Sequence, residues 1–220
     1  MRRLILLAVL AAVPACTQPT RAPQPTVAPP KSEPAAPAVQ RATPVLPPDR
    51  AAPQRPIGTA QRVADPALAD EFNNLSSDGD IYFAGWPSEA GLRTLAARGV
   101  KTVIALKTPE QVMDARGYDP RAVAKELGIA YVVIPVTPDS YDAAVLDRFA
   151  AAFDGSAGPI LIHCGSSSTV GGVWSGYLAA KRGVPSDQAL DRGRAAGLRE
   201  GPMTDAAERV IGSTGSQPKK

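Results

Sequence analysis

A histidine–cysteine pair stands in the middle of the stretch Pro159–Gly172, which reads PILIHCGSSSTVGG. His163 is the only histidine of the chain, and an apolar run typical of a strand leads directly into it. Cys164 follows, then glycine and hydroxyl residues, and then a helical pattern that opens at Gly171. This order places a thiol over backbone N–H groups at a helix N-terminus, an environment that binds anions and favours the thiolate.

Strand and helix patterns alternate around this stretch and must position it. Apolar runs predict strands over 81–84, 102–106, 130–136 and 160–162. Amphipathic patterns predict helices over 87–98, 121–127, 169–182, 186–198 and 204–211. Thr108 and Gln111 form a capping box, and Asp139 or Ser140 is expected to cap a helix that includes Phe153. The alternation predicts an α/β domain with a mostly parallel central sheet flanked by helices.

Sheets of this kind place their ligand site beyond the C-terminal ends of the strands. The residues that directly follow the four predicted strands should therefore gather at one edge of the sheet. They are Gly85 and Trp86, Lys107 and Thr108, Thr137, Asp139 and Asp142, and His163 to Thr169.

The histidine–cysteine segment resembles the signature of the cysteine-dependent phosphatases of the tyrosine and dual-specificity type, in which His-Cys is followed by five residues and an arginine. The stretch Ile81–Lys107, IYFAGWPSEAGLRTLAARGVKTVIALK, is similar to the opening of a bacterial phosphatase-like branch of that superfamily. With the later segment VWSGYLAAKRGV, the resemblance covers about residues 78–212. It implies the cysteine-phosphatase-like fold and no cofactor.

The chain departs from the family pattern at the arginine. That position corresponds to Val170, or to Thr169 in the bacterial branch, and no Arg or Lys occurs in the loop that starts at Cys164. Trp86 and Lys107 also stand where the branch carries Gln and Arg. Since a guanidinium binds two phosphate oxygens and stabilises charge in the transition state, the departure bears on activity more than on fold.

The resemblance implies a role for each residue of the site. Cys164 would be the nucleophile, and His163 would be structural, orienting the loop by hydrogen bonding. Asp139 would be the general acid, with Asp142 second, because the family's acid lies on the loop after the strand that precedes the cysteine strand. Substrate and anion binding would fall to Gly165, Ser166, Ser167, Ser168, Thr169, Val170, Lys107 and Trp86.

Structural interpretations stand beside these roles. Cys164 fits a buried core residue, the loop serines fit ordinary turn chemistry, and Asp139 fits a helix N-cap. A cation that replaces the arginine would come from Lys107 or from one of Arg192, Arg194 and Arg199, although surface arginines are usually solvated.

The composition excludes several classes of partner. The formal net charge is only +3 and the basic residues are scattered, so the sequence predicts no nucleic-acid interface. Two cysteines and one histidine are too few for a zinc site of several Cys and His ligands, and we expect no metal.

The N-terminal stretch MRRLILLAVLAAVPAC has a basic start and a short apolar segment, the pattern of an export signal. Its end, Val13 to Cys16, resembles the lipobox of bacterial lipoproteins, although Pro14 is unusual there. The resemblance implies lipidation at Cys16; the alternative is simple cleavage after Ala15. We therefore expect an exported, periplasmic protein held at a membrane by an N-terminal lipid anchor, with a mild preference for the outer membrane.

Domain boundaries follow from composition. Residues 1–16 form the signal, and residues 17–67, rich in proline and alanine, lack the large apolar side chains of a core and are expected to be a disordered tether. Residues 68–212 are expected to form one phosphatase-like domain, and 213–220 a mobile tail.

Three functions remain open at this point. The first is hydrolysis of a phosphate ester on a small molecule or protein, with Cys164 as nucleophile and impaired by the missing arginine. The second is a non-catalytic pseudophosphatase that binds an anion or a protein partner. The third and weaker one is rhodanese-like sulfur transfer.

Overall fold

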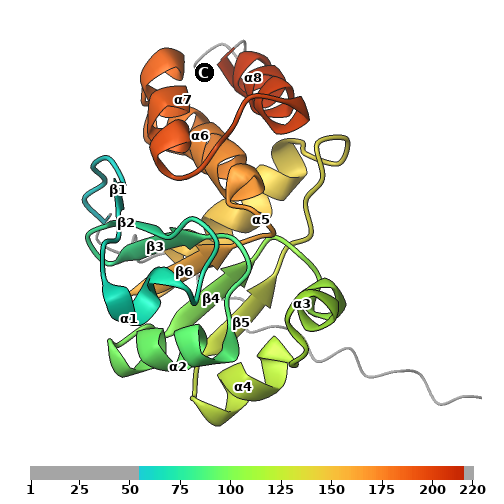
Figure 1. The fold of residues 1–220 in the computed structure, drawn as a ribbon. Helices are drawn as coiled ribbons and strands as arrows, with labels where there is room; N and C mark the ends of the chain where they lie inside the picture. The colour runs from blue at the N-terminus through green and yellow to red at the C-terminus, as the bar shows by residue number, and fades with distance from the viewer. Residues whose placement is uncertain (1–54, 216–220) are drawn as a thin grey trace, which may run out of the picture. The chain divides into compact units, whose positions relative to one another are not determined.

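A six-stranded sheet forms the centre of the domain (Figure 1). The computed structural model describes residues 55–215. The strands, in chain order, are β1 (Gln61–Arg62), β2 (Ser76–Asp78), β3 (Ile81–Ala84), β4 (Thr102–Ala105), β5 (Ala130–Val133) and β6 (Ile160–His163). Their spatial order is β1-β2-β3-β6-β4-β5, in which β3, β6, β4 and β5 are parallel and β1 and β2 add an antiparallel edge. The prediction of a mostly parallel α/β sheet is confirmed.

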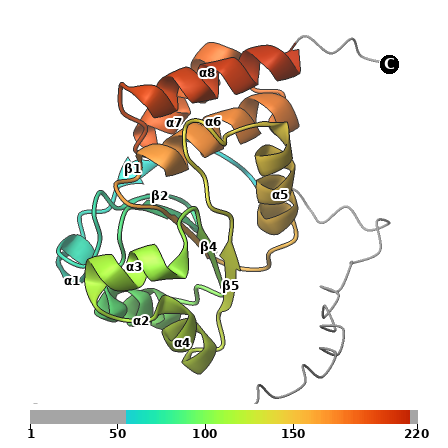
Figure 2. The same ribbon diagram turned by 90° about the vertical axis from the view of Figure 1, so that its right-hand side faces the viewer.

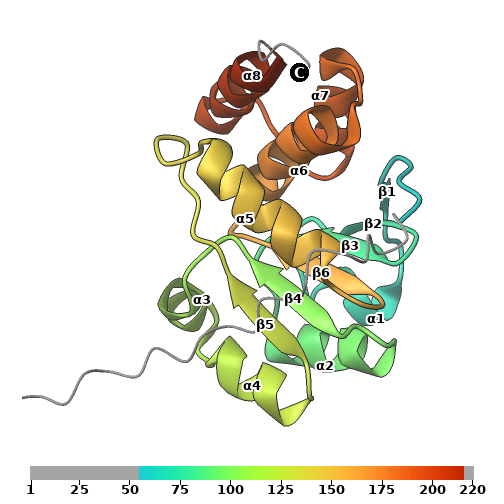
Figure 3. The same ribbon diagram turned by 180° about the vertical axis from the view of Figure 1, so that it is seen from behind.

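Helices cover both faces of this sheet (Figures 1 and 3). They are α1 (Pro66–Ala69), α2 (Glu89–Ala97), α3 (Pro109–Arg116), α4 (Pro120–Glu126), α5 (Ala143–Asp154), α6 (Ser168–Arg182), α7 (Ser186–Ala195) and α8 (Pro202–Gly215). One apolar core joins the sheet to α5, α6, α7 and α8, and a second joins it to α1, α2 and α4. Figure 2 shows α6, α7 and α8 stacked together at one end of the domain.

The cysteine strand β6 is buried on both faces. Ile160 and Ile162 pack into the first core and Leu161 into the second, as the two-residue period of a strand requires. Each of the three side chains is completely buried. Central parallel strands of this kind appear as continuous apolar runs in the sequence, which is why β6 could be predicted.

Side-chain caps begin most of the helices around the site. The predicted capping box of Thr108 and Gln111 is present at α3. The cap predicted for α5 is wrong: Asp142 accepts the Val145 N–H at 2.8 Å, while Ser140 bonds back to Thr137 in a separate turn. Because residues 137–140 form this turn, α5 begins at Ala143, later in the chain than predicted.

The folded domain begins earlier than predicted. Residues 55–67, which the sequence analysis assigned to the tether, include β1 and the start of α1. Arg55 bonds Asp80 at 2.5 Å and the Ser156 carbonyl at 2.9 Å, which fastens this segment to the domain. The sequence patterns missed β1 and β2 because both are very short and polar. At the other end, α8 extends through Gly215 into the predicted tail.

The predicted export signal, the lipidation site Cys16 and the tether up to residue 54 lie outside the described residues. Within 55–215, no helix combines the length and the apolar character needed to cross a membrane.

Candidate active site

Cys164 lies directly beyond β6, at the edge of the sheet where the parallel strands end. The His163 position pairs with Ala84 of β3 on one side and Ala105 of β4 on the other. The Cys164 N–H then donates to the Ala84 carbonyl at 3.2 Å. The residue is 1% exposed and belongs to the first apolar core, and its backbone is held by β3.

The cysteine loop, residues 164–170, is held through its carbonyl groups. The Gly165 carbonyl accepts the Trp86 N–H at 3.1 Å and the Asn73 side-chain amide at 3.4 Å. The Ser166 carbonyl accepts the Asn74 side-chain amide at 3.2 Å. Because the peptide bonds are trans, the Ser166 N–H points away from the Gly165 carbonyl and its partners. The loop therefore turns carbonyl oxygens, which would repel an anion, toward neighbouring donors.

Ser167 fixes the entry into α6. Its backbone is left-handed, with φ 74°, and its side chain is completely buried. The hydroxyl donates to the carbonyls of Asn73 and Asn74, each at 3.2 Å, and makes no cap hydrogen bond to α6. The N-terminus of this 15-residue helix consequently lacks a side-chain cap, which leaves its positive end for an anion.

The remaining residues of the cysteine loop divide by exposure. Ser166 is exposed, and Ser168 and Thr169 are half-buried. Ser168 Oγ accepts the Arg199 N–H at 3.3 Å. Val170 is completely buried in the core, so only its backbone could meet an anion. Of the four hydroxyl residues predicted to bind an anion, Ser166 is the most exposed, and the hydroxyl of Ser167 serves the scaffold.

Close backbone approach brings the Gly85–Trp86 segment against the cysteine loop. A Cβ added to Gly85 would lie 2.6 Å from the Gly165 carbonyl oxygen, so only glycine fits there. A Cβ added to Gly165 would lie 3.3 Å from the Trp86 ring. The Trp86 ring therefore lies against the cysteine loop, and its predicted role in anion binding stays a prediction.

His163 is a neutral, completely buried base. Burial lowers its pKa to about 4, and the neighbouring Cys164 backbone opposes this shift. Its Nε2 lies 3.3 Å from the Tyr131 hydroxyl of β5, and its Nδ1 has no hydrogen-bond partner among the described residues. This hydrogen bond joins His163 to β5 and not to the cysteine loop, so its role in orienting the loop stays a prediction.

Lys107 leaves β4 beside the cysteine loop. The Leu106 N–H donates to the His163 carbonyl at 2.8 Å, so the next residue in the chain, beyond the end of β4, lies at the level where the loop begins. Lys107 is half-buried and forms no ion pair within the described part of the chain. Lys107 is therefore a cation at the same edge of the sheet as the cysteine loop, and no carboxylate among residues 55–215 pairs with it.

Arg116 is a second nearby cation, which the sequence analysis missed. One terminal nitrogen donates to the Trp86 carbonyl at 2.8 Å and to Asn73 Oδ1 at 3.2 Å, while its buried Nε has no partner among the described residues. Trp86 and Asn73 are the same residues that hold the Gly165 carbonyl. The only signal in the sequence is a basic residue in the last turn of a capped helix.

The predicted replacement arginines differ in their contacts. Arg194 pairs with Asp191 at 3.0 Å and with Glu200 at 3.5 Å. Arg199 meets the loop through its backbone N–H, which donates to Ser168. Arg192 is half-buried on α7. Arg199 is therefore the one of the three whose backbone the structure ties to the cysteine loop.

Asp139 lies in a tight turn after β5. Thr137 and Ser140 close this turn through mutual backbone and hydroxyl hydrogen bonds, and the Asp139 side chain is exposed. Tyr141 anchors the loop to α6, with its hydroxyl 3.4 Å from the Gly172 carbonyl. On the other side Arg209 of α8 donates to the Pro138 carbonyl at 2.9 Å. These contacts hold the turn that contains Asp139 beside the N-terminal half of α6. The Asp142 side chain caps α5.

Among residues 55–215 there is no group of three or more His, Cys, Asp or Glu side chains that could hold a metal ion. The chemistry available at this edge of the sheet is that of a thiol, backbone donors and single charges.

Residues 87–180 match the family model described as the phosphatase-like domain of beta-lactamase hydrolase-like proteins. Solved structures of phosphatase type share the fold. TpbA from P. aeruginosa is 23% identical with a TM-score of 0.52, and the match covers 70% of this chain and 89% of TpbA. A variant of Tk-PTP is 19% identical with a TM-score of 0.50, and the match covers 62% of this chain and 92% of Tk-PTP.

PTPMT1 has the same fold, at 13% identity and a TM-score of 0.50, with 63% of this chain and 94% of PTPMT1 covered. No curated protein matches the chain. The family model thus matches residues 87–180, and the solved structures share the fold of the domain.

Proposed function

We propose that this chain is a cysteine-dependent, phosphatase-like hydrolase of phosphate esters with Cys164 as its nucleophile. The observation that carries the proposal is the position of Cys164 directly after β6. The loop that follows has its Gly165 and Ser166 carbonyls hydrogen-bonded to Asn73 and Asn74, and the next helix has no side-chain cap. Backbone N–H groups and the helix dipole would receive the phosphate oxygens at that point. TpbA has been solved with phosphotyrosine, which makes an aryl phosphate the natural first substrate.

The proposed reaction has two steps. The Cys164 thiolate attacks phosphorus, the bond from phosphorus to the ester oxygen breaks, and Asp139 donates its proton to the leaving oxygen. Water then attacks the cysteinyl phosphate and gives up a proton to Asp139, which releases inorganic phosphate and restores the thiolate. The exposed position of Asp139 on an anchored turn supports its assignment as the acid.

Charge stabilisation is the weak part of this site. Without the loop arginine, Lys107 is the best-placed side-chain cation, since it leaves β4 next to the start of the loop. An ammonium acts as a point charge and cannot bind two oxygens in a fork. We therefore expect slow turnover, lower by about 10²–10³ than in a site that has the arginine.

The second candidate function is a non-catalytic pseudophosphatase that binds an anion or a protein partner. The observation that favours it is Val170, which fills the arginine position with an apolar side chain buried in the core. Such a protein would keep the backbone cradle and lose the transition-state charge.

Hydrolysis of phenyl phosphate by the full chain, measured beside Cys164→Ser, separates the two functions. Turnover that is lost in Cys164→Ser supports the phosphatase, and absence of turnover in both proteins supports the pseudophosphatase. Equal turnover in both would contradict the proposed nucleophile. The third interpretation, sulfur transfer, requires thiosulfate-dependent activity in the same preparations.

Asp139 and Asp142 form a matched pair for the acid. Asp139→Asn should lower turnover by about 10²–10⁴ and leave stability nearly unchanged, because its side chain caps nothing. Asp142→Ala should instead cost about 1 kcal/mol of stability through loss of the α5 cap, with turnover largely retained. The reverse result would transfer the role of the acid to Asp142.

We further propose that the protein is exported and anchored by a lipid on Cys16, on the strength of the N-terminal pattern alone. Metabolic labelling with a radioactive fatty acid should mark the wild-type chain and not Cys16→Ser. Labelling of neither protein, with cleavage after Ala15, would replace the anchor by a free periplasmic form.

A further inference from the structure

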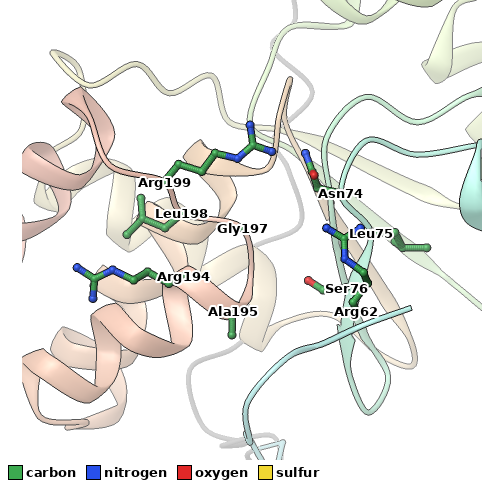
Figure 4. Close-up of a pocket in the computed structure, with 9 residues that line it drawn as sticks. All are labelled: Arg62, Asn74, Leu75, Ser76, Arg194, Ala195, Gly197, Leu198 and Arg199. Atoms are coloured by element: carbon green, nitrogen blue, oxygen red, sulfur yellow. The ribbon is translucent and has the colours of Figure 1, made fainter. Parts of the chain in front are cut away.

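A cavity of about 200 Å³ lies beside the cysteine loop, between the antiparallel edge of the sheet and the turn that joins α7 to α8 (Figure 4). Arg62 of β1, Asn74 and Ser76 form one wall, and Arg199 belongs to the other. We call these four residues and the space between them the basic cavity.

The two walls are fixed by contacts to the cysteine loop. Asn74 donates its side-chain amide to the Ser166 carbonyl, and the Arg199 N–H donates to Ser168 Oγ. Gly197, in the turn after α7, has φ 112° and lies so close to Ser167 that a side chain would not fit. The cavity and the loop are therefore neighbours that share the same supporting residues.

The charges of the basic cavity are unbalanced. Arg62 and Arg199 are both exposed, and neither has an acidic partner in the described part of the chain. Figure 4 shows the Arg199 guanidinium extending toward Asn74, with Arg62 on that same wall. Arg194 also lines the space, but it points away and is neutralised by Asp191 and Glu200. Two free guanidinium groups on facing walls form a fork for an oxyanion.

Ser76 adds an independent sign of a missing ligand. Its side chain is 6% exposed, and its hydroxyl has no hydrogen-bond partner among the described residues. Ser76 is directly opposite Arg62 in the β1–β2 pair, so both side chains lie on the same face of the sheet. Figure 4 shows the hydroxyl turned toward the cavity. A buried hydroxyl without a partner destabilises a protein, and an acceptor oxygen here would satisfy it.

We propose that the basic cavity binds a second oxyanion, inorganic phosphate or a phosphate monoester, next to the cysteine loop. Arg62 and Arg199 supply the charge, and Asn74 and Ser76 line the wall on the side of Arg62. Binding there is independent of turnover at Cys164, because none of the four residues touches the proposed reacting atoms. Phosphate fits this site better than a single carboxylate, because it has oxygens for both walls.

The test is a titration of the full chain with inorganic phosphate at constant ionic strength, followed by the NMR signals of the arginine Nε–H groups and of the Ser76 amide. We expect saturable shifts at Arg62, Arg199 and Ser76 that sodium chloride does not reproduce. Arg62→Gln and Arg199→Gln should each weaken this binding by roughly tenfold, since each removes charge-assisted hydrogen bonds. Both side chains are exposed, so both variants should fold.

Arg194→Gln is the matched control, because it removes one positive charge from the same surface without removing a free guanidinium. Equal weakening in Arg194→Gln and Arg199→Gln would overturn the proposal in favour of general surface charge. Shifts confined to the cysteine loop, or none at these three residues, would overturn it outright.

Phenyl phosphate, titrated into Cys164→Ser so that none is consumed, distinguishes the two sources of the anion. Tighter binding than inorganic phosphate at Arg62 and Arg199 would identify a monoester site, and equal or weaker binding a site for free phosphate.

Discussion

The cysteine loop and the basic cavity are neighbouring regions with opposite strengths. The loop holds Cys164, which we propose as the nucleophile, at the start of a helix without a side-chain cap, and residues 164–170 include no Arg or Lys. The basic cavity has two guanidinium groups and a hydroxyl that find no partner among residues 55–215, and its lining includes no cysteine. The thiol and the exposed positive charge therefore lie in separate regions of this protein.

The two regions also differ in how their serines are used. The Ser167 hydroxyl, in the loop, donates a hydrogen bond to two carbonyls. The Ser76 hydroxyl, in the cavity, has no hydrogen-bond partner among the described residues. A satisfied buried hydroxyl supports the fold, whereas an unsatisfied one requires an explanation, which the proposed anion supplies at Ser76. The buried hydroxyl of Ser167 already has its hydrogen bonds within the protein, so its loss should affect stability. Loss of the cavity side chains should affect binding.

The largest effect is expected from giving the loop the charge that it lacks. Thr169→Arg places a guanidinium at a half-buried position in the first turn of α6, which Val170, in the core, does not permit. Turnover of phenyl phosphate should rise by about 10²–10³, measured as kcat/KM. Thr169→Lys is the control and should give a smaller gain, because an ammonium cannot form the bidentate contact. No gain in either variant would mean that charge does not limit this site.

The next effect concerns the buried base under the loop. The pKa of His163 in the folded protein is about 4, against 6.5 in the absence of burial, so the unfolded chain binds a proton first as the pH falls. Its contribution to stability is complete above about pH 6.5 and declines as the pH is lowered toward 4. Between pH 7 and pH 5 the free energy of unfolding should fall by about 2 kcal/mol.

Urea denaturation at the two pH values measures this change. His163→Gln should remove that part of the pH dependence, and no other histidine exists to replace it. An unchanged slope in the variant would contradict the neutral, buried state of His163. The guanidinium groups of the basic cavity do not titrate in this pH range, so a change in phosphate binding there should follow the second ionisation of the phosphate, which has a pKa of about 6 in phosphate monoesters.

The smallest effect separates the two serines. Ser167→Ala leaves a buried carbonyl without its donor and should cost about 1–2 kcal/mol in unfolding free energy. Ser76→Ala removes a hydroxyl that has no partner in the described residues and should leave stability equal or slightly higher. Ser166→Ala, at an exposed position, is the control and should change stability by less than about 0.5 kcal/mol. Equal destabilisation by Ser167→Ala and Ser76→Ala would remove the distinction between the regions.

Several parts of this site could be predicted from local patterns. The four parallel strands are apolar runs, and the rule that their C-terminal ends share an edge correctly gathered Trp86, Lys107 and Cys164. The capping box at Thr108 was also predicted, because it depends on residues three apart in the chain. The role of Asp139 as an acid stays a prediction, whereas its alternative as the α5 cap was wrong.

Other parts had no local signal. Arg116 reaches Trp86 and Asn73, and Asn73 contacts Gly165 across 92 positions in the chain. The β1 strand is two polar residues long, so neither period nor composition indicated that Arg62 would pair with Ser76. Such contacts depend on where the chain returns to the sheet, and no short window of sequence contains that information.

The sequence by itself determined the order of strand, cysteine, loop and helix, because hydrophobic period and small-residue turns are local properties of the chain. It also determined that the loop has no arginine. Only the tertiary structure decided which hydroxyls face outward, that the α6 N-terminus lacks a side-chain cap, and that Arg62 and Arg199 face one another across a cavity. These depend on hydrogen bonds and packing between segments far apart in the chain, which form only when the whole sheet and its helices are in place.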